Sequence, residues 1–266
     1  MGRALELITG RTVAAGATPT SVTVSAGNSL TVRNGAPDKP IYLLNAWVDS
    51  QGAGLLQIRS PQLHDNVRGI RVRHVVSEPK FLLPQAKVQK LVSQDSLTVE
   101  LSGSATAGDF DSFGMLVYYE DLIGVNSRLH HWAELESRIE DLVTVDSIIT
   151  SGAGGGYTGS EALNADSDLL RANTDYAVLG YHVETECAAV RMTGVDFGNL
   201  GIGGPGVSDD KQFSGSFFMQ LARRTDLPLI PVLNSANKAG TLVDVAADEN
   251  AGTITISWIL GQLAPL

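Results

Sequence analysis

The sequence predicts an all-β protein built from two similar halves that are joined by one amphipathic helix. Short apolar or alternating segments recur along the 266 residues at a spacing of roughly 8–12 residues, with Gly and Pro between them. This pattern is typical of β-sandwiches and barrels. One segment near the midpoint has the period of a helix instead. Several segments of the first half also recur in the second half, in the same order.

The helix is expected over Ser127–Val143, which reads SRLHHWAELESRIEDLV. Its apolar residues recur at steps of three and four, and charged residues fill the other face. Asn126 or Ser127 can cap its start, because a short side-chain oxygen accepts a hydrogen bond from an otherwise unpaired backbone N–H. The helix divides the chain into a first unit at 1–126, a linking helix at 127–143 and a second unit at 144–266.

Strands are expected on both sides of this helix. In the first unit the main candidates are Leu5–Thr9, Ser21–Val24, Ser29–Arg33, Tyr42–Ser50, Leu55–Arg59, Gly69–Val76, Ser96–Leu101 and Phe113–Tyr119. In the second they are Val145–Thr150, Tyr176–Val183, Ala188–Met192, Leu229–Leu233, Thr241–Val245 and Thr253–Leu260. The segment Gln85–Val92 has the pattern of a helical excursion between strands, and Phe217–Arg224 fits either a helix or a strand.

Two glycine-rich segments of the second unit are expected to be surface loops. Ser151–Ser160 reads SGAGGGYTGS, a composition that favours a mobile connection over a helix. Leu200–Ser208 contains four glycines and a proline. Both loops are candidates for contacts with neighbouring molecules.

The composition excludes several classes of function. A net charge of −10 argues against nucleic acid as the main partner, because phosphate binding needs clustered Lys and Arg, and it disfavours attachment to anionic membranes. The single cysteine, Cys187, forms no intrachain disulfide and indicates folding in a reducing compartment. The N-terminus lacks an apolar signal core, and the chain lacks a run of 18 apolar residues, so synthesis in the cytosol is expected.

Four pairs of segments carry the internal repeat. Their order is the same in both halves, although β-strands resemble one another and generic similarity is the alternative explanation. The pairs are Ile8-Thr9-Gly10 with Ile149-Thr150-Ser151, Tyr42–Trp47 with Tyr176–Tyr181, Leu82-Leu83-Pro84 with Leu229-Ile230-Pro231, and Gly114–Leu122 with Thr255–Leu263. A duplication predicts two β-sandwiches of about 130 residues each, with the amphipathic helix at their junction.

With these two β-rich halves, its length and its helical excursions, the chain resembles the double-jelly-roll major capsid proteins of tailless, often membrane-containing viruses and phages. The resemblance implies two tandem jelly-roll β-sandwiches and a trimeric, pseudo-hexagonal capsomer with its strands roughly normal to an icosahedral shell. It also implies a virion location after synthesis in the host cytoplasm. The implied partners are further copies of the chain, other virion proteins and an internal membrane where the virion has one, with no sequence-specific nucleic acid.

Two groups of residues have the spacing of a chemical site. His130 and Glu134 stand one helical turn apart, the geometry of a two-ligand metal site, while His131 lies beside them. Because no HExxH motif is present, an ion pair on the helix surface is the preferred interpretation. Gly201, Gly203 and Gly206 match the bare G-x-G-x-x-G spacing, but Pro205 and the residues after it do not continue into an amphipathic helix, so nucleotide binding is not expected.

The remaining candidates have plain structural interpretations. Ser214-Gly215-Ser216 lacks the spacing of a nucleophile elbow, and Cys187 is expected to be a small buried residue. Arg71 and Arg73 are expected on one face of a strand, with Arg68 nearby; a plain solvent-facing strand is preferred over contact with an acidic neighbour or with an internal lipid or genome surface. Three acidic pairs are expected at solvated loop tips: Asp109/Asp111, Asp209/Asp210 and Asp248/Glu249. The alternative is that they supply oxygen ligands to Ca²⁺ between subunits.

We therefore expect a structural virion protein with no catalytic, cofactor or metal residues, and no enzyme activity. The alternative is a phage spike, fibre or decoration β-sandwich that binds a glycan or a receptor, and it predicts an exposed cluster of aromatic and Asp/Asn residues on one rim. Aromatic residues make up only 6% of the chain, which weighs against that alternative. A metal-dependent jelly-roll enzyme ranks third, because the His/Glu pair lies on the predicted helix and such enzymes place their ligands on strands.

Overall fold

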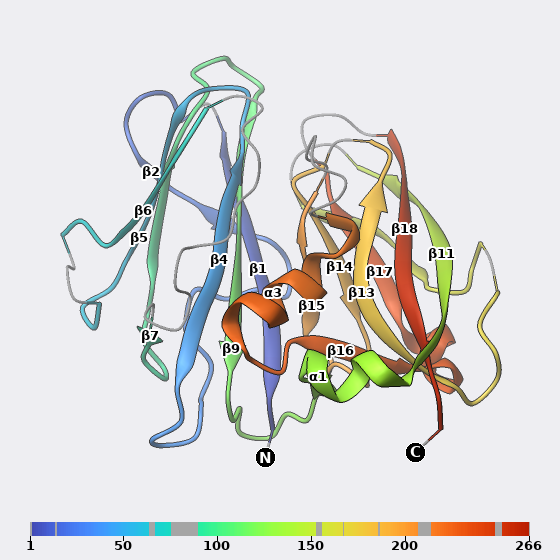
Figure 1. The fold of residues 1–266 in the computed structure, drawn as a ribbon. Helices are drawn as coiled ribbons and strands as arrows, with labels where there is room; N and C mark the ends of the chain where they lie inside the picture. The colour runs from blue at the N-terminus through green and yellow to red at the C-terminus, as the bar shows by residue number, and fades with distance from the viewer. Residues whose placement is uncertain are drawn as a thin grey trace.

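The computed structural model describes residues 2–13, 15–63, 67–75, 90–152, 156–166, 168–185, 187–206, 214–247 and 252–265. The described chain is mostly β, as predicted, and its strands form four antiparallel sheets (Figure 1). The first half contains β1 (Ala4–Val13), β2 (Thr20–Ser21), β3 (Thr23–Val24), β4 (Ile41–Asp49), β5 (Gly54–Arg59), β6 (Ile70–His74), β7 (Lys90–Leu91), β8 (Thr98–Ser102) and β9 (Phe110–Tyr119).

The described residues of the second half form nine further strands and four short helical elements. In chain order these are β10 (Leu129–His130), α1 (Trp132–Leu135), the 3₁₀ helix η2 (Glu136–Arg138), β11 (Ile139–Ser151), β12 (Tyr157–Ala162), β13 (Asp175–Val183), β14 (Ala189–Thr193), β15 (Gly201–Pro205), α3 (Phe217–Thr225), β16 (Ile230–Asn234), the 3₁₀ helix η3 (Ser235–Gly240), β17 (Leu242–Ala246) and β18 (Gly252–Leu263). The expected helical excursion Gln85–Val92 lies mostly outside the described residues, apart from β7.

Both halves have the same strand order. The first half forms the sheets β3-β1-β9-β4-β7 and β2-β8-β5-β6, and the second half forms β10-β16-β13-β18-β11 and β12-β17-β14-β15. When β3 and β10 are set aside, β1-β9-β4-β7 corresponds to β11-β18-β13-β16, and β2-β8-β5-β6 corresponds to β12-β17-β14-β15. In each half the first strand therefore pairs with the last, which brings distant parts of the sequence together.

The repeat found in the sequence joins strands of equal position in this order. Three of the four matched pairs fall in β1 and β11, in β4 and β13, and in β9 and β18. The fourth pair includes 82–84, which lie outside the described residues. Both β4 and β13 also carry a bulge, between Leu43 and Asn45 and between Val178 and Gly180. The ungapped match aligns Leu44 with Val178, so the two bulges differ by one position from that alignment.

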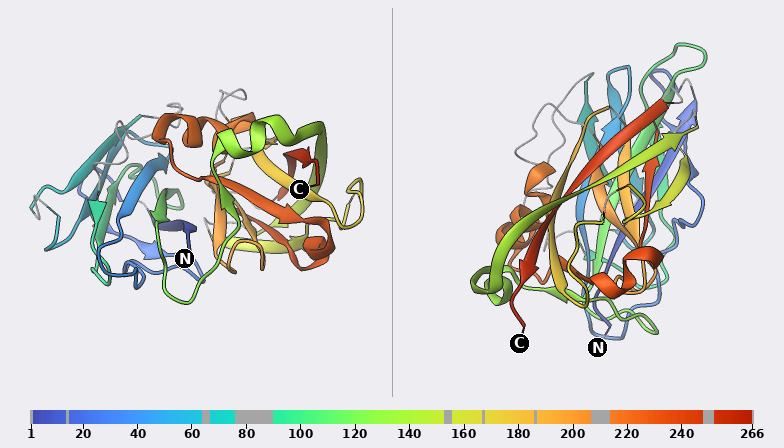
Figure 2. Two further views of the ribbon diagram at one scale, coloured as in Figure 1. Left: turned by 60° about the horizontal axis from the view of Figure 1, so that its bottom comes forward. Right: turned by 90° about the vertical axis from the view of Figure 1, so that its right-hand side faces the viewer.

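The two halves stand side by side, and their long strands run in roughly the same direction (Figures 1 and 2). The sheet β3-β1-β9-β4-β7, called the middle sheet below, is buried on both faces. One face packs on the other sheet of the first half, through residues such as Leu43, Phe113 and Leu56. The opposite face contributes to an apolar cluster that continues through the second half, with Leu5, Leu7, Leu44, Trp47, Leu116 and Tyr118. This shared cluster makes the junction part of the core.

The linking helix predicted over Ser127–Val143 is wrong for most of its length. Only Trp132–Leu135 is α-helical, a 3₁₀ turn follows at Glu136–Arg138, and Leu129–His130 is the short strand β10. From Ile139 onward the chain is β11, paired with β18 along its whole length. The β-branched residues after Val143 favour a strand. Leu142, which the predicted helix would have buried, is 62% exposed, whereas Leu129 and Leu135 of the same apolar stripe are buried.

The second half therefore begins its first long strand at Ile139, ahead of the boundary expected at residue 144. The short strand expected at Ser29–Arg33 is also absent as a strand: Thr31 forms an isolated bridge to Ser96. Phe217–Arg224, for which helix and strand were both open, is the helix α3. Within the described residues, no helix has the length and apolar character needed to cross a membrane.

Candidate functional site

Most of the glycine-rich segment Leu200–Ser208, expected as a surface loop, is instead the strand β15 (Gly201–Pro205), while 207–208 lie outside the described residues. Its residues Ile202–Pro205 are buried, and the strand pairs with β14 and lies against β1 of the first half. A Cβ atom on Gly203 would lie 1.9 Å from the carbonyl oxygen of Val190, and one on Gly204 would lie 2.4 Å from Oη of Tyr181. The glycines are thus required by close approach of neighbouring strands and rings, which is a packing role and not phosphate binding.

Trp47 joins the two halves on the middle sheet. Its side chain is 2% exposed and belongs to the apolar cluster shared with the second half. Its indole Nε1 donates a hydrogen bond of 3.0 Å to the carbonyl oxygen of Ala188, just before β14. Gly114 on β9 makes room for the ring, because a Cβ there would lie 2.1 Å from Cζ2 of Trp47. A buried indole with a satisfied N–H across the junction fixes how the halves meet.

The helix α3 covers strand β13 with its apolar face. Phe217, Phe218, Leu221 and Ala222 are buried, and the helix ends at Asp226 in the left-handed region, whose N–H donates to the carbonyl oxygen of Ala222. Its exposed Arg223 lies 4.8 Å from the ring centre of Trp132 and 3.3 Å from Glu136. These contacts tie α1 and η2 to α3.

An ionic network anchors the linking segment to the second half. Arg128 donates two hydrogen bonds to Asp175, of 2.9 and 2.6 Å, and lies 3.7 Å from Asp196. Asn234 donates a further bond of 2.7 Å to Asp175. The two bonds from Arg128 lower the pKa of the Asp175 carboxyl, and its bond to Asp175 raises the pKa of Arg128. The network therefore fixes the chain where it passes from one half to the other.

Asp175→Asn is expected to lower the free energy of unfolding at neutral pH more than at pH 3. The pKa of Asp175 is below its unfolded value, so the stabilisation is present above about pH 4 and is lost as the pH falls through the folded pKa. Urea unfolding of the variant and the parent at both pH values measures the difference. Asp168→Asn, which removes a half-exposed partner of Lys238, is the control and should change little. An equal loss for Asp175→Asn at both pH values would contradict the role given to its charge.

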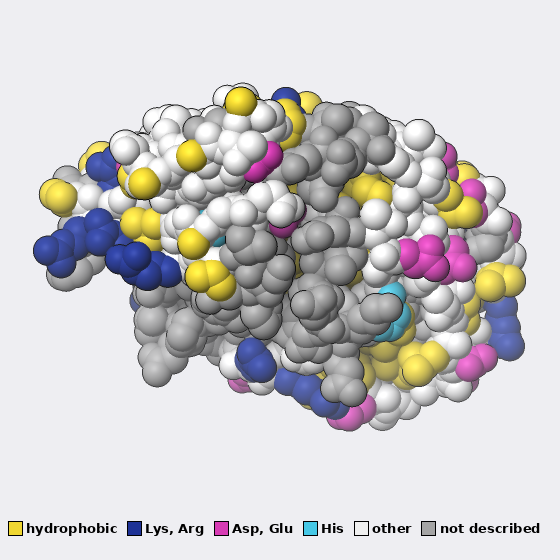
Figure 3. Space-filling model, turned by 90° about the horizontal axis from the view of Figure 1, so that it is seen from above, with side chains coloured by type: hydrophobic (Ala, Val, Ile, Leu, Met, Phe, Trp, Pro, Cys, Tyr) yellow, Lys and Arg dark blue, Asp and Glu magenta, His cyan; other side chains and the backbone are white. Residues whose placement is uncertain are grey.

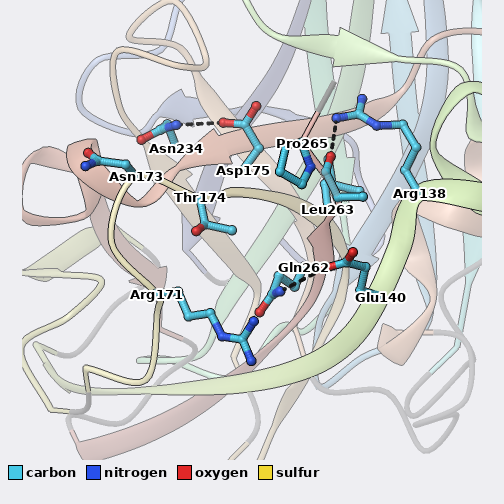
Figure 4. A pocket seen from close by; sticks show the side chains of 11 residues that line it. Arg138, Glu140, Arg171, Asn173, Thr174, Asp175, Asn234, Gln262, Leu263 and Pro265 are labelled. Carbon is cyan, nitrogen blue, oxygen red and sulfur yellow. Dashed lines mark hydrogen bonds between the residues drawn. The ribbon is translucent and has the colours of Figure 1, made fainter.

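A polar pocket of about 350 Å³ lies at the end of the second half near the C-terminus (Figure 4). Its lining comes from the beginnings of β11 and β13, the ends of β16 and β18 and residues beside them. Arg138 donates to the carbonyl oxygen of Ala264 at 2.8 Å, and Gln262 donates to Glu140 at 3.4 Å. Several of the lining groups bond to one another and their charges are mixed, which fits a polar network at the strand ends.

The residues considered for metal binding do not converge. His130 is in β10, His131 is the N-cap of α1, and Glu134 lies within α1. His130 and Glu134 are therefore not on one helix, as had been expected. Nδ1 of His130 lies 3.3 Å from Oε2 of Glu134, and Glu134 also accepts a hydrogen bond from the backbone of His131. The contact is therefore an exposed helix cap. Across the described parts of the chain, no three His, Cys, Asp or Glu side chains lie close enough together to hold a metal ion.

The predicted environments of Cys187 and of the acidic pairs have different outcomes. Cys187 is fully buried, as expected. Asp111 is wrong as a loop tip: it is fully buried in β9, where it accepts hydrogen bonds from Ser50 and from the backbone of Ser104. Asp109 accepts a bond from Ser104 at 2.5 Å. The pairs Asp209/Asp210 and Asp248/Glu249 lie outside the described residues, and Ser214 is buried.

The loop expected at Ser151–Ser160 is strand at both of its ends. Ser151 ends β11 and Tyr157 begins β12, while 153–155 lie outside the described residues. Arg71 and Arg73 lie on β6 and are exposed on the same face, as the alternation predicted. β6 in the first half and β11 in the second thus each have an exposed strand face.

Sequence reasoning missed the junction residues Trp47 and Gly203 and the Arg128–Asp175 pair. A signal for the junction exists in the strands themselves, because YLLNAWV and GMLVYY are continuous apolar runs. Such runs indicate a strand covered on both faces, whereas alternation indicates one solvated face. No local pattern indicates the pairing of Arg128 with Asp175, since the two residues are brought together only by the fold.

No protein-family model matches the sequence, and a search of curated proteins finds no match. A search of solved structures matches the major capsid protein of bacteriophage PM2, with 11% identity over 98% of each chain and a TM-score of 0.22. A TM-score of this size is well below the value that a shared fold gives. The match therefore adds nothing to what the strand order and the packing of this chain support.

Proposed function

We propose that this chain is the major capsid subunit of a virus or phage, a double jelly roll that assembles as a trimeric, pseudo-hexagonal capsomer and then as an icosahedral shell. The virion is its location in this proposal, and its partners are further copies of itself and other virion proteins. Its role is structural, so the subunit has to be a rigid block whose outer faces are complementary to those of neighbouring subunits.

The strand order supports the jelly-roll part of this proposal. Numbered one to eight within each half, the strands form sheets in the order 1-8-3-6 and 2-7-4-5, with β3 and β10 as additions. That order is the one expected of a jelly roll, an architecture used by capsid, lectin and cupin domains. Because one architecture serves several functions, the order alone does not favour a capsid over a binding protein.

The observation that carries the proposal is the fusion of two such halves through one apolar cluster. Leu5, Leu7, Trp47 and Tyr118 of the middle sheet share a core with the second half, so the halves form one body with their strands in roughly the same direction (Figure 1). Three copies of such a block around an axis place six similar sandwiches in a ring. Closed rotational symmetry repeats one contact at every junction of such a ring. In this proposal the six-sided outline of the ring lets neighbouring capsomers pack side by side in the shell.

Light scattering of the purified protein tests this proposal. We expect a particle with three times the chain mass of 28.1 kDa, or larger multiples of that trimer. The trimer should persist on dilution into the micromolar range, because side-by-side sandwiches bury interfaces of the standard size or larger. A monomer at every concentration would overturn the proposal, and glycan binding by that monomer would support the alternative of a spike or decoration protein.

A further inference from the structure

The face of the middle sheet that is buried at the junction has an exposed counterpart in the second half. β1 and β9 are covered by β15 of the same chain, whereas the corresponding strands β11 and β18 face outward (Figure 2). Residues of β11 alternate between exposed and buried from Thr144 to Ser151, and Leu142 and Ile148 are 62% and 42% exposed. We call this surface the β11 face; it comprises the exposed Leu142, Thr144, Asp146 and Ile148 of β11 and the half-buried Thr255 and Ser257 of β18.

The strand that covers the middle sheet also has an exposed counterpart. β15 is the edge strand of its sheet, and β6 occupies the same edge position in the first half. Arg71 and Arg73 are exposed on β6, and neither contacts a carboxylate among the described residues. Arg59 on the neighbouring β5 is paired with Glu100 at 2.6 Å. We call this surface, with Arg71 and Arg73 at its centre, the β6 face.

The two faces carry opposite charges at opposite ends of the molecule. Figure 3 shows Lys and Arg side chains gathered at the end formed by the first half, and mainly Asp and Glu side chains at the end formed by the second half. On the β11 face Asp146 is exposed and accepts a hydrogen bond of 2.6 Å from Ser257. Asp166 lies at the free edge of β11, where it accepts a bond of 2.6 Å from the backbone of Ile148.

We propose that the β6 face of one copy docks on the β11 face of the next copy, with Arg71 and Arg73 opposite Asp146 and Asp166. This contact repeats between subunits the one that β15 makes with β1 within the chain, and it rests on the proposed capsid function. The β11 face mixes apolar and polar residues, whereas the face of the middle sheet at the junction is mainly apolar, with Thr9 and Asn45 as its buried polar residues. That difference fits an interface formed after folding, since surfaces exposed in the free subunit keep polar groups.

Docking of unlike faces is head-to-tail, so it forms either a closed ring or an open chain of subunits. Every subunit then offers one β6 face and one β11 face, and a ring leaves neither face free. The charges give the contact its direction, because two β6 faces or two β11 faces repel each other.

Charge exchange tests the pairing of these faces. We prepare Arg71→Glu/Arg73→Glu, Asp146→Lys/Asp166→Lys, and a chain with all four substitutions, and measure their masses by light scattering across a dilution series. Each pair of substitutions places like charges at every junction, so we expect the trimer to weaken by roughly tenfold or more per junction. The chain with all four substitutions restores opposite charges at every junction, and we expect it to recover the trimer.

Mixing the two paired variants gives a sharper result. Contacts between unlike variants are complementary, and contacts between like variants are repulsive. A three-membered ring of two kinds of subunit contains at least one like contact, so the mixture should form pairs in preference to closed trimers. Glu134→Lys/Glu136→Lys, on α1 and η2, changes the net charge by the same amount as Asp146→Lys/Asp166→Lys, away from both faces, and should leave the trimer unchanged. Circular dichroism confirms that each variant is folded.

The outcomes separate this inference from the proposed function. If the parent is a trimer and the charge variants remain trimers of equal strength, the docking faces are wrong and the capsid function stands. If both paired variants dissociate but the chain with all four substitutions does not recover, the two faces do not face each other. A parent that stays monomeric overturns the proposed function and the inference with it.

Discussion

Trp47→Ala is expected to lower the free energy of unfolding by about 3–5 kcal/mol, the range for deleting a buried aromatic side chain. Trp47 is 2% exposed, its ring lies over Gly114, and it takes part in the cluster that joins the halves. The variant also loses the hydrogen bond to the carbonyl oxygen of Ala188. Because the lost contacts cross the junction, we further expect the halves to unfold less cooperatively.

Urea unfolding followed by two signals measures both effects. Circular dichroism reports on the whole chain, and the fluorescence of the variant reports on Trp132 and Trp258, which both belong to the second half. The two signals should coincide in the parent and separate in the variant. Trp132→Ala is the matched control, since Trp132 is only partly buried, and its cost should be smaller. Equal costs for the two variants would contradict the role of Trp47 in joining the halves.

Gly203→Ala is expected to cost about 1–3 kcal/mol although it adds a single carbon atom. The added Cβ would lie 1.9 Å from the carbonyl oxygen of Val190, a backbone atom of the paired strand β14. β15 cannot shift away from β14 to make room for the Cβ without disturbing the junction, because β15 also lies against β1. Thermal unfolding measures the cost as a lower Tm.

Gly252→Ala is the control for this substitution. Gly252 is also a strand residue, at the beginning of β18, but a Cβ there meets nothing within 4 Å. The control should leave the Tm unchanged or raise it slightly, because alanine has less freedom in the unfolded chain. A Tm for Gly203→Ala within one degree or so of the parent would show that β15 has room for a side chain, and the close packing of the junction would then be wrong.

The strands of the fold are largely predictable from the sequence, because their apolar runs and alternation are local signals. Tyr42–Ser50 and Phe113–Tyr119 were expected as strands and correspond to β4 and β9. The repeat also pointed to the correct equivalences, β1 with β11, β4 with β13 and β9 with β18. The order of strands within a sheet is set by pairing between distant segments, which no local pattern specifies.

The errors at Ser127–Val143 and Leu200–Ser208 have a common cause. In both, a local preference is overridden by long-range pairing. The stretch after Ile139 matches a helical stripe over a few residues, yet pairing with β18 along the whole of β11 makes it a strand. Glycines normally weaken a strand, but β15 needs them because other strands and rings approach its backbone closely. The Arg128–Asp175 pair was invisible for the same reason, as only the fold brings it together.

The central claim is that this chain is a capsid subunit made of two fused, similar sandwiches, and imaging of the purified protein by electron cryo-microscopy tests it most directly. The claim predicts particles of three chains with a pseudo-hexagonal outline, in which six similar sandwiches surround one axis, and closed shells of these particles at high concentration. Single copies with no tendency to assemble, or dimers related by a two-fold axis, would contradict it.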